Sequence, residues 1–149
     1  MTTSQTYHVF IRADAQRIWT ALTAPELSAG YLFGALVDTT AEPGSPFRYR
    51  APDGNTLWGD DIVLDAAPPH RLVVTYRGLY HPELAAEPPS RVTWQIDPDS
   101  NSVSLLTVIH DNLDHAPKTA ARVAGPGWMR VLSGLKTLLE TGQPLNGAS

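Results

Sequence analysis

The sequence predicts an α+β fold in which one long C-terminal helix covers a sheet of about seven antiparallel strands. Turn residues recur about every eight to twelve positions between residues 34 and 109, which is typical of antiparallel strands joined by turns. Apolar residues then recur every three or four positions in the last third of the chain, which indicates a helix with one apolar face. A sheet with one apolar face needs such a helix to bury it.

The N-terminal part predicts one strand followed by two short helices. In the strand, Thr6 to Arg12, β-branched and aromatic residues alternate with polar ones. Asp14 is a good N-cap for the first helix. Pro25 either ends that helix or begins the second one, because proline disfavours helix in the residue before it. An aromatic and apolar segment, Tyr31 to Phe33, follows.

Six further strands are predicted where β-branched and apolar runs lie between turn residues. They are Ala35 to Thr39, Ser45 to Arg50, Leu57 to Asp65, Arg71 to Arg77, Arg91 to Asp97 and Val103 to His110. Turn sequences such as Pro52-Asp53-Gly54 and Pro98-Asp99-Ser100-Asn101 join them. The segment from Gly78 to Pro89 has three prolines and no clear periodicity, so we expect a surface loop there.

The long C-terminal helix is predicted from its apolar face. The residues of that face are Trp128, Val131, Leu132, Leu135, Leu138 and Leu139. Gly142 with Pro144 behind it is typical of a helix end. Gly125-Pro126-Gly127 interrupts an earlier helical turn that the residues Pro117 to Val123 allow.

One face of the predicted sheet is apolar, because apolar and polar residues alternate in most strands. In the fourth strand, Trp58, Ile62 and Leu64 share one parity and are expected to face the helix. Asp61 has the opposite parity and is expected outside. Asp60 has the parity of Trp58, so its carboxylate is expected among apolar neighbours, where burial raises a carboxyl pKa.

Charge, cysteine count and hydropathy exclude several function classes. The chain has 149 residues and a formal charge of −4, from 11 basic and 15 acidic residues, so a nucleic-acid partner is not expected. It has no cysteine, which excludes disulfides and thiolate chemistry. No segment approaches the roughly 18 consecutive apolar residues of a membrane helix, and residues 1–8 lack the features of a secretory signal. We therefore expect a soluble cytoplasmic protein with one domain over residues 1–149 and polar termini at 1–4 and 143–149.

Three groups of residues, taken in order, resemble one known family over nearly the whole chain. They are Ile18 to Thr23 with Pro25 to Leu27, then Pro68 to Leu72 with Thr75 and Tyr76, then Gly127 to Leu132 with Leu135, Lys136 and Leu139 to Gly142. The sequence resembles the Activator of Hsp90 ATPase homologue-like group of the START-like, or SRPBCC, superfamily. That resemblance implies a helix-grip fold, a curved sheet wrapped around the C-terminal helix. The fold is shared by lipid carriers, hormone receptors, cyclases, oxygenase domains and co-chaperones, so it leaves function open.

Two departures from the family pattern bear on the ligand rather than on the fold. The family usually has a tryptophan where this chain has Tyr31, and a Gly-Gly turn where it has Pro43 to Pro46.

A ligand-binding cavity between helix and sheet is expected from the aromatic residues. The candidate ligand-binding residues are Tyr31, Phe47, Tyr49, Trp58, Asp60, Tyr76, Trp94, His110, Trp128 and Leu132, with Phe33 and Tyr31 as a lid. Apolar walls with a few polar groups are typical of small-molecule pockets. The alternative is that the same side chains fill the core. The resemblance favours the pocket, because a cavity commonly remains where such a sheet wraps around one helix.

Polar residues give no clear sign of catalysis. His110 ends the last strand and is either a polar anchor in the cavity or a hydrogen-bonded structural histidine. Asp60 is either a cavity carboxylate or a group at the wet end of its strand. The five histidines form no metal-binding pair and no nucleophile motif is present, so we expect no catalytic residue, no metal and no cofactor.

The leading hypothesis is a non-enzymatic protein that binds a small, largely hydrophobic molecule. One alternative is a co-chaperone-like interaction module, with a chaperone or another protein as partner. Another is a cyclase or hydrolase of polyketide-like substrates that uses His110 and a carboxylate for acid–base chemistry. The last strand is apolar on both sides, which suggests a homodimer. Membrane insertion is not expected.

Overall fold

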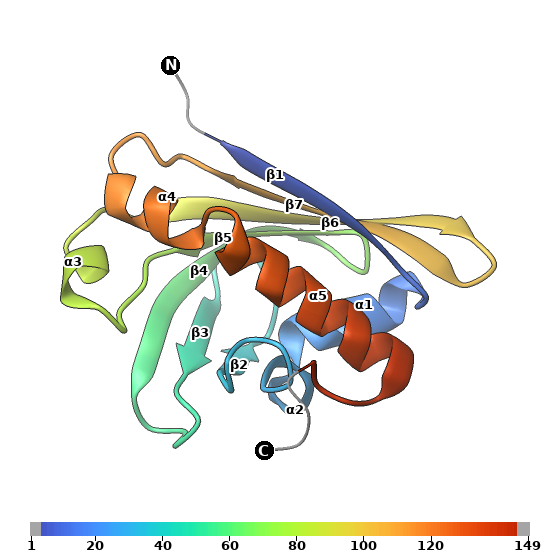
Figure 1. Ribbon diagram of the computed structural model, residues 1–149. Coiled ribbons are helices and arrows are strands. Elements are labelled where there is room, and N and C mark those ends of the chain that lie inside the picture. Colours follow the sequence, from blue (N-terminus) through green and yellow to red (C-terminus); the bar gives the residue numbers. More distant parts are fainter. Residues whose placement is uncertain (1–3, 146–149) are drawn as a thin grey trace.

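The computed structural model describes residues 4–145 (Figure 1). Its strands are β1 (Gln5–Ile11), β2 (Leu36–Thr39), β3 (Pro46–Arg50), β4 (Leu57–Ala67), β5 (Arg71–Tyr76), β6 (Ser90–Ser100) and β7 (Val103–Asp111). Its helices are α1 (Ala15–Thr23), α2 (Pro25–Ser28), α3 (Pro82–Ala85), α4 (Pro117–Val123) and α5 (Pro126–Thr141). Of the predicted polar termini, residues 1–3 and 146–149 lie outside the described residues.

All seven strands join in one antiparallel sheet with the order β1-β7-β6-β5-β4-β3-β2. Helix α5 lies across one face of this sheet, with α3 and α4 near one end of it and α1 and α2 near the other (Figure 1). The predicted α+β fold, with a seven-stranded sheet, two short helices after β1 and a long C-terminal helix, is therefore confirmed.

Local capping explains where the helices begin and end. The Asp14 carboxylate accepts a hydrogen bond of 2.8 Å from the Arg17 N–H and so caps α1. Pro25 opens α2, which decides between the two alternatives that the sequence left open. At the other end of the chain, Gly142 ends α5 in the left-handed conformation, with φ at 79°. None of the helices within residues 4–145 is long and apolar enough to cross a membrane.

Strand β4 bends the sheet, because its two ends pair with different neighbours. Its first half pairs with β3 and its second half with β5, and each pairing contains a register shift. In the first shift, Tyr49 pairs with Gly59 and Arg50 with Leu57, so that Trp58 is an extra residue. A bulge of this kind bends the strand and increases its twist. The sheet therefore curves around α5.

The same bulge makes the predicted inner face of β4 wrong. An extra residue shifts the alternation of the strand by one position. Ile62 and Leu64 are consequently exposed by 50% and 49%, whereas Asp61 and Val63 are buried. Trp58 stays on the inner side because it lies at the bulge itself, before the shift takes effect.

Two connections also differ from the prediction. The β6–β7 turn lies at Asn101 and Ser102, both with positive φ, and Pro98 belongs to the strand that precedes it. The segment from Gly78 to Pro89 contains α3, and its Leu84 side chain is buried, so it is not a simple surface loop.

Glu87 of this segment caps α4 from a distance. Its carboxylate accepts the backbone N–H groups of Lys118 and Thr119, both at 2.8 Å, and the Thr119 hydroxyl at 2.7 Å. The N-cap residue Ala116 has no side-chain oxygen, so Glu87 supplies the missing acceptors. This contact holds the segment with α3 against α4.

Replacing Glu87 with alanine is expected to loosen the first turn of α4. Losing a cap costs about 1 kcal/mol, so the amides of Lys118 and Thr119 are expected to exchange hydrogen roughly fivefold faster. Glu83→Ala is the matched control, because Glu83 only forms an exposed ion pair with Lys118 at 3.8 Å. Equal exchange rates in the two variants would show that Glu87 is not the cap.

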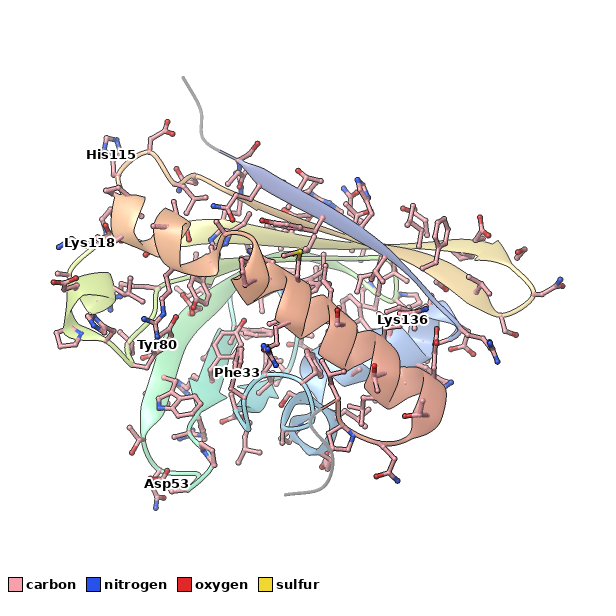
Figure 2. The ribbon with its side chains drawn as sticks, viewed as in Figure 1. Phe33, Asp53, Tyr80, His115, Lys118 and Lys136 are labelled. Atoms are coloured by element: carbon pink, nitrogen blue, oxygen red, sulfur yellow. The ribbon has the colours of Figure 1, made fainter. Side chains whose placement is uncertain are left out.

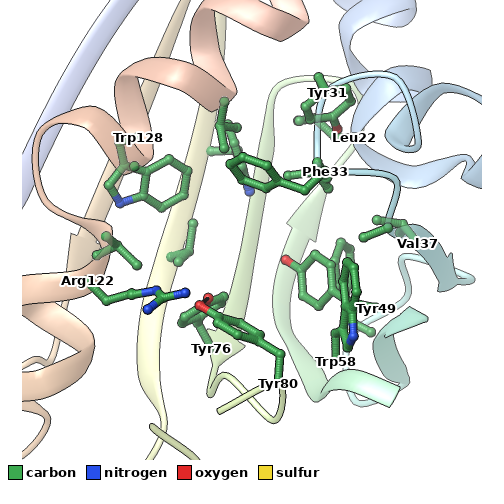
Figure 3. A pocket seen from close by; sticks show the side chains of 18 residues that line it. Leu22, Tyr31, Phe33, Val37, Tyr49, Trp58, Tyr76, Tyr80, Arg122 and Trp128 are labelled. Atoms are coloured by element: carbon green, nitrogen blue, oxygen red, sulfur yellow. Dashed lines mark hydrogen bonds between the residues drawn. The ribbon is translucent and has the colours of Figure 1, made fainter. Parts of the chain in front are cut away.

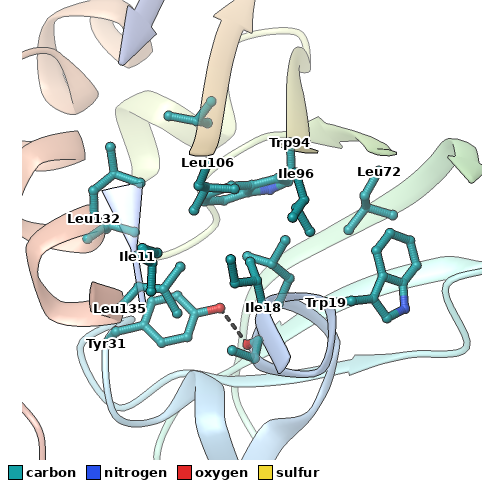
Figure 4. Close-up of a cluster of buried hydrophobic side chains, with 14 of the residues drawn as sticks. Ile11, Ile18, Trp19, Tyr31, Leu72, Trp94, Ile96, Leu106, Leu132 and Leu135 are labelled. Atoms are coloured by element: carbon teal, nitrogen blue, oxygen red, sulfur yellow. Dashed lines mark hydrogen bonds between the residues drawn. The ribbon is translucent and has the colours of Figure 1, made fainter. Parts of the chain in front are cut away.

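Core packing is uneven along α5. The second half of the helix packs Leu132, Leu135 and Leu139 against α1 and the sheet, where Ile18 and Leu106 are also buried (Figure 4). This end is filled by side chains. The first half of α5 instead faces a cavity.

Candidate functional site

A pocket of about 390 Å³ lies between the first half of α5 and the curved part of the sheet (Figure 3). Such a volume is within the range of small-molecule sites. It is lined by Leu22, Tyr31, Leu32, Phe33, Ala35, Val37, Phe47, Tyr49, Trp58, Tyr76, Tyr80, Val92, Trp94, Arg122, Val123, Gly127, Trp128 and Val131. Most of these side chains are aromatic or aliphatic, and Arg122 is the one charged residue in the lining.

Seven of the ten candidate ligand-binding residues line this pocket. They are Tyr31, Phe47, Tyr49, Trp58, Tyr76, Trp94 and Trp128. Phe33, expected as part of a lid, also lines it and is 62% exposed, which places it at the mouth (Figure 2). Asp60, His110 and Leu132 are not among the lining residues. Leu132 belongs to the filled half of the core instead.

Asp60 lies on the outer face of the sheet, contrary to the prediction. Its carboxylate forms an ion pair of 3.0 Å with the Arg48 guanidinium, and the Asp60 side chain is 44% exposed. The physical reason is the β4 bulge, which reverses the parity of the residues after Trp58.

Asp61 is the buried carboxylate of this strand. Its residue is only 3% exposed, Oδ1 accepts a hydrogen bond of 2.8 Å from the Thr75 hydroxyl, and Oδ2 accepts no hydrogen bond of normal geometry from the described residues. Burial raises the pKa of Asp61 to about 7, although the Thr75 hydrogen bond and the backbone N–H and charge of Arg77 oppose the shift. The sequence signal for this site is Gly59, because a glycine inside a strand often marks a bulge.

Gly59 also lets a pocket residue pack closely on β4. A Cβ atom at this position would lie 2.7 Å from Cδ2 of Tyr49, so only glycine leaves room for the tyrosine ring. Tyr49 pairs with Gly59 across the two strands and continues into the pocket lining.

His110 lies behind the pocket wall, fully buried, and both of its ring nitrogens have partners. The Trp128 indole N–H donates to Nδ1 at 3.2 Å, so that nitrogen carries no proton. Nε2 therefore carries the proton and donates to the Ser90 hydroxyl at 2.7 Å, which in turn donates to the Tyr76 carbonyl at 3.0 Å. Burial lowers the pKa of His110 to about 4, so the imidazole is neutral at physiological pH.

The His110 network positions two residues of the pocket wall. The rings of Tyr76 and Trp128 lie edge-on to the imidazole, with centroid distances of 5.4 and 5.7 Å. Of the two interpretations of His110 from the sequence, this geometry matches the hydrogen-bonded structural histidine.

Hydroxyl groups of the pocket differ in whether they have partners. The Tyr31 hydroxyl donates to the Ala21 carbonyl at 2.6 Å, so it is already engaged (Figure 4). The Tyr49 hydroxyl points into the pocket and forms none of the hydrogen bonds found among residues 4–145 (Figure 3). Burial raises the pKa of Tyr49 well above its usual range, so its hydroxyl keeps the proton and can donate it to a ligand.

Two lining residues were missed by the sequence analysis, namely Tyr80 and Arg122. Tyr80 lies in the segment that shows no periodicity, and Arg122 lies in the short helix before α5. Neither segment shows from its own pattern that it borders the cavity. The docking of α3 against α4 places both residues at its edge.

No group of three or more histidine, cysteine, aspartate and glutamate side chains within the described residues is arranged to hold a metal ion. His115, one of the five histidines, lies at the periphery of the molecule and is not among the pocket lining (Figure 2).

Solved structures with a similar fold come from several bacteria. A protein from Mesorhizobium loti, MLL2253, is 23% identical with a TM-score of 0.74, over 93% of this chain and 97% of that one. The Aha1 dimer from Colwellia psychrerythraea is 17% identical with a TM-score of 0.71, over 94% and 98%. CalU16 from Micromonospora echinospora is 18% identical with a TM-score of 0.70, over 95% and 78%. At these identities the similarity shows the helix-grip fold alone.

Comparison with curated proteins gives no match. A family model, in contrast, matches residues 12–140, which is most of the chain and includes the pocket lining. The chain therefore belongs to the family described as Activator of Hsp90 ATPase homolog 1-like protein.

Proposed function

We propose that this protein binds a small, largely apolar molecule in the pocket between α5 and the sheet. The observation that carries the proposal is a cavity of about 390 Å³ with mostly aromatic walls and a few polar groups. Burial of apolar ligand surface against such walls is the main source of affinity in sites of this kind. Members of this fold class commonly bind hydrophobic ligands, which agrees with the proposal.

The aromatic walls support one another without filling the cavity. Phe47 and Tyr49 pack edge to face with a centroid distance of 5.3 Å, and Tyr49 and Tyr76 continue the row at 6.4 Å. Trp94 and Trp128 pack in the same way at 5.5 Å. Edge-to-face contacts stabilise each ring in place, so the walls are preformed for a ligand.

Binding is favoured over catalysis by the state of the titratable groups. Both ring nitrogens of His110 are engaged within the protein, and the buried carboxylate of Asp61 is not among the lining residues. A general acid or base must reach the proton that it transfers. We therefore infer a carrier or sensor of its ligand rather than an enzyme.

A tryptophan at Val123 is expected to fill the pocket and abolish binding. Val123 is half-buried and lines the cavity, so the larger side chain has space to enter it. We expect the affinity for N-phenylnaphthylamine, a neutral probe that fluoresces in apolar sites, to fall at least tenfold, in line with loss of most of the buried probe surface. Val103→Trp is the matched control, because Val103 is half-buried but does not line the pocket.

Thermal unfolding of both variants checks that they are folded. Equal probe binding by the two variants would place the probe elsewhere and contradict the proposal.

Native mass spectrometry of the purified protein is an independent test, because a co-purifying apolar molecule identifies the ligand class. The same spectrum gives the oligomeric state, and recovery of a stoichiometric chaperone from extract would favour the co-chaperone alternative.

A further inference from the structure

We propose that the pocket selects a ligand whose apolar, aromatic body carries an anionic oxygen group, and that Arg122 binds this group at the mouth. The inference rests on the proposed function, because it names the chemistry of the molecule that the same pocket binds. It is carried by the position of Arg122 and by the donor character of the polar groups around it.

Arg122 stands at the edge of an otherwise uncharged cavity. Its guanidinium carbon lies 5.6 Å from the centroid of the Tyr80 ring, and Figure 3 shows the side chain turned toward the two tyrosines, Tyr76 and Tyr80. A cation over an aromatic face is held in place while its N–H groups stay available. The guanidinium is therefore oriented at the mouth before any ligand arrives.

Six other cations within residues 4–145 already have anionic partners. Arg48, Arg50, Arg71, Arg91, Lys118 and Lys136 each pair with an aspartate or glutamate. Arg122 forms none of the ion pairs found within residues 4–145, and no carboxylate belongs to the pocket lining. An anionic group on a ligand could therefore form an ion pair with the Arg122 guanidinium without displacing a carboxylate of the protein.

The remaining polar groups of the pocket also favour an acceptor. The guanidinium only donates hydrogen bonds, and the neutral Tyr49 hydroxyl has a proton to donate. The hydroxyls of Tyr76 and Tyr80 share one hydrogen bond of 2.9 Å, which leaves one further O–H free to donate. A cationic ligand finds no opposing charge here, whereas a carboxylate, sulfonate or phenolate finds several donors.

Selection by contact, rather than by long-range attraction, follows from the overall charge. The formal charge of the chain is −4, so the protein as a whole does not attract anions. The preference must come from Arg122 at short range, where a charged hydrogen bond is strongest.

A matched pair of probes tests this inference. Anilinonaphthalene sulfonate has the ring system of N-phenylnaphthylamine with an added sulfonate, so the two differ in the anionic group alone. In the Arg122→Gln variant we expect the affinity for the sulfonate to fall roughly fivefold to tenfold, while the affinity for the neutral probe stays unchanged. Added salt should weaken sulfonate binding in the wild type and have little effect in the variant.

Arg130→Gln is the control for the loss of one positive charge, because exposed Arg130 does not line the pocket. It is expected to bind both probes as the wild type does. Equal loss of both probes in Arg122→Gln, or no loss of either, overturns the role of Arg122 while leaving the pocket intact. If neither probe binds the wild type, it is the proposed function that fails.

Discussion

Replacing His110 with phenylalanine is expected to destabilise the protein by about 3 kcal/mol at pH 7, because a buried indole N–H loses its acceptor. The Trp128 N–H donates to Nδ1 of His110, and phenylalanine has no acceptor to offer in its place. The Ser90 hydroxyl also loses the proton that Nε2 donates. Urea unfolding of the wild type and the variant measures the difference.

The pH dependence of His110 gives this prediction a second test. Its pKa is lowered from 6.5 to about 4 in the folded protein, so the unfolded chain binds more protons between these values. The contribution of neutral His110 to the free energy of unfolding is complete above pH 6.5. It is lost as the pH falls toward 4, by up to about 3 kcal/mol. This loss is expected to be absent in the phenylalanine variant.

His110→Gln serves as the comparison for the phenylalanine variant. Glutamine has both an acceptor and a donor but does not titrate, so it is expected to regain part of the stability and to stay insensitive to acid. A phenylalanine variant as stable as the wild type would contradict the buried network. An unchanged acid dependence would contradict the neutral state of His110.

Asp61→Asn is expected to stabilise the protein at pH 8 by up to about 4 kcal/mol, since it removes a buried negative charge. The folded pKa of Asp61 is about 7, above its ordinary value of 3.8, so folding favours the protonated carboxyl. The favourable contribution of protonated Asp61 to the free energy of unfolding is complete below pH 3.8 and is lost as the pH rises through 7. Near pH 4 the two proteins are expected to have nearly the same stability.

Asp60→Asn is the matched control, because it is the adjacent residue with the same chemical change. Asp60 forms an exposed pair with Arg48, so this variant is expected to change stability by no more than about 1 kcal/mol. Urea unfolding at pH 4, 6 and 8 measures all three proteins. A gain that is independent of pH, or equal in the two variants, would show that the charge of Asp61 is not the cause.

His110 and Asp61 act in opposite directions between about pH 4 and 6.5. Acidification removes stability through His110 and adds it through Asp61. The wild-type curve is therefore expected to be flatter than the curve of either variant. Only the differences between variants separate the two groups.

Most of the secondary structure was predictable because its signals are local. Pro25, Gly142 and the turn residues act on the backbone within a few positions, and their elements lie within a few residues of the predicted bounds. Periodicity predicted α5 for the same reason, since apolar residues spaced three or four positions apart within the helix define its apolar face.

The pocket was only partly predictable. Aromatic residues on inner strand faces, such as Tyr76 and Trp94, follow from alternation and line the cavity. Alternation failed at β4, where one extra residue exchanged Asp60 for Asp61 on the inner side. No sequence pattern predicted that Tyr80 and Arg122 border the pocket, because their positions depend on the contact between two separate segments.

The sequence by itself determined the α+β class, the seven strands, the two short helices after the first strand, the long C-terminal helix and the family, because turn signals, periodicity and ordered motifs are local properties of the chain. The tertiary structure alone decided which carboxylate is buried, which end of the space under α5 stays open and where its one cation stands. Each of these depends on how β3 meets β4 or how α3 meets α4. Such contacts join residues that are distant along the chain, and no local pattern encodes their register.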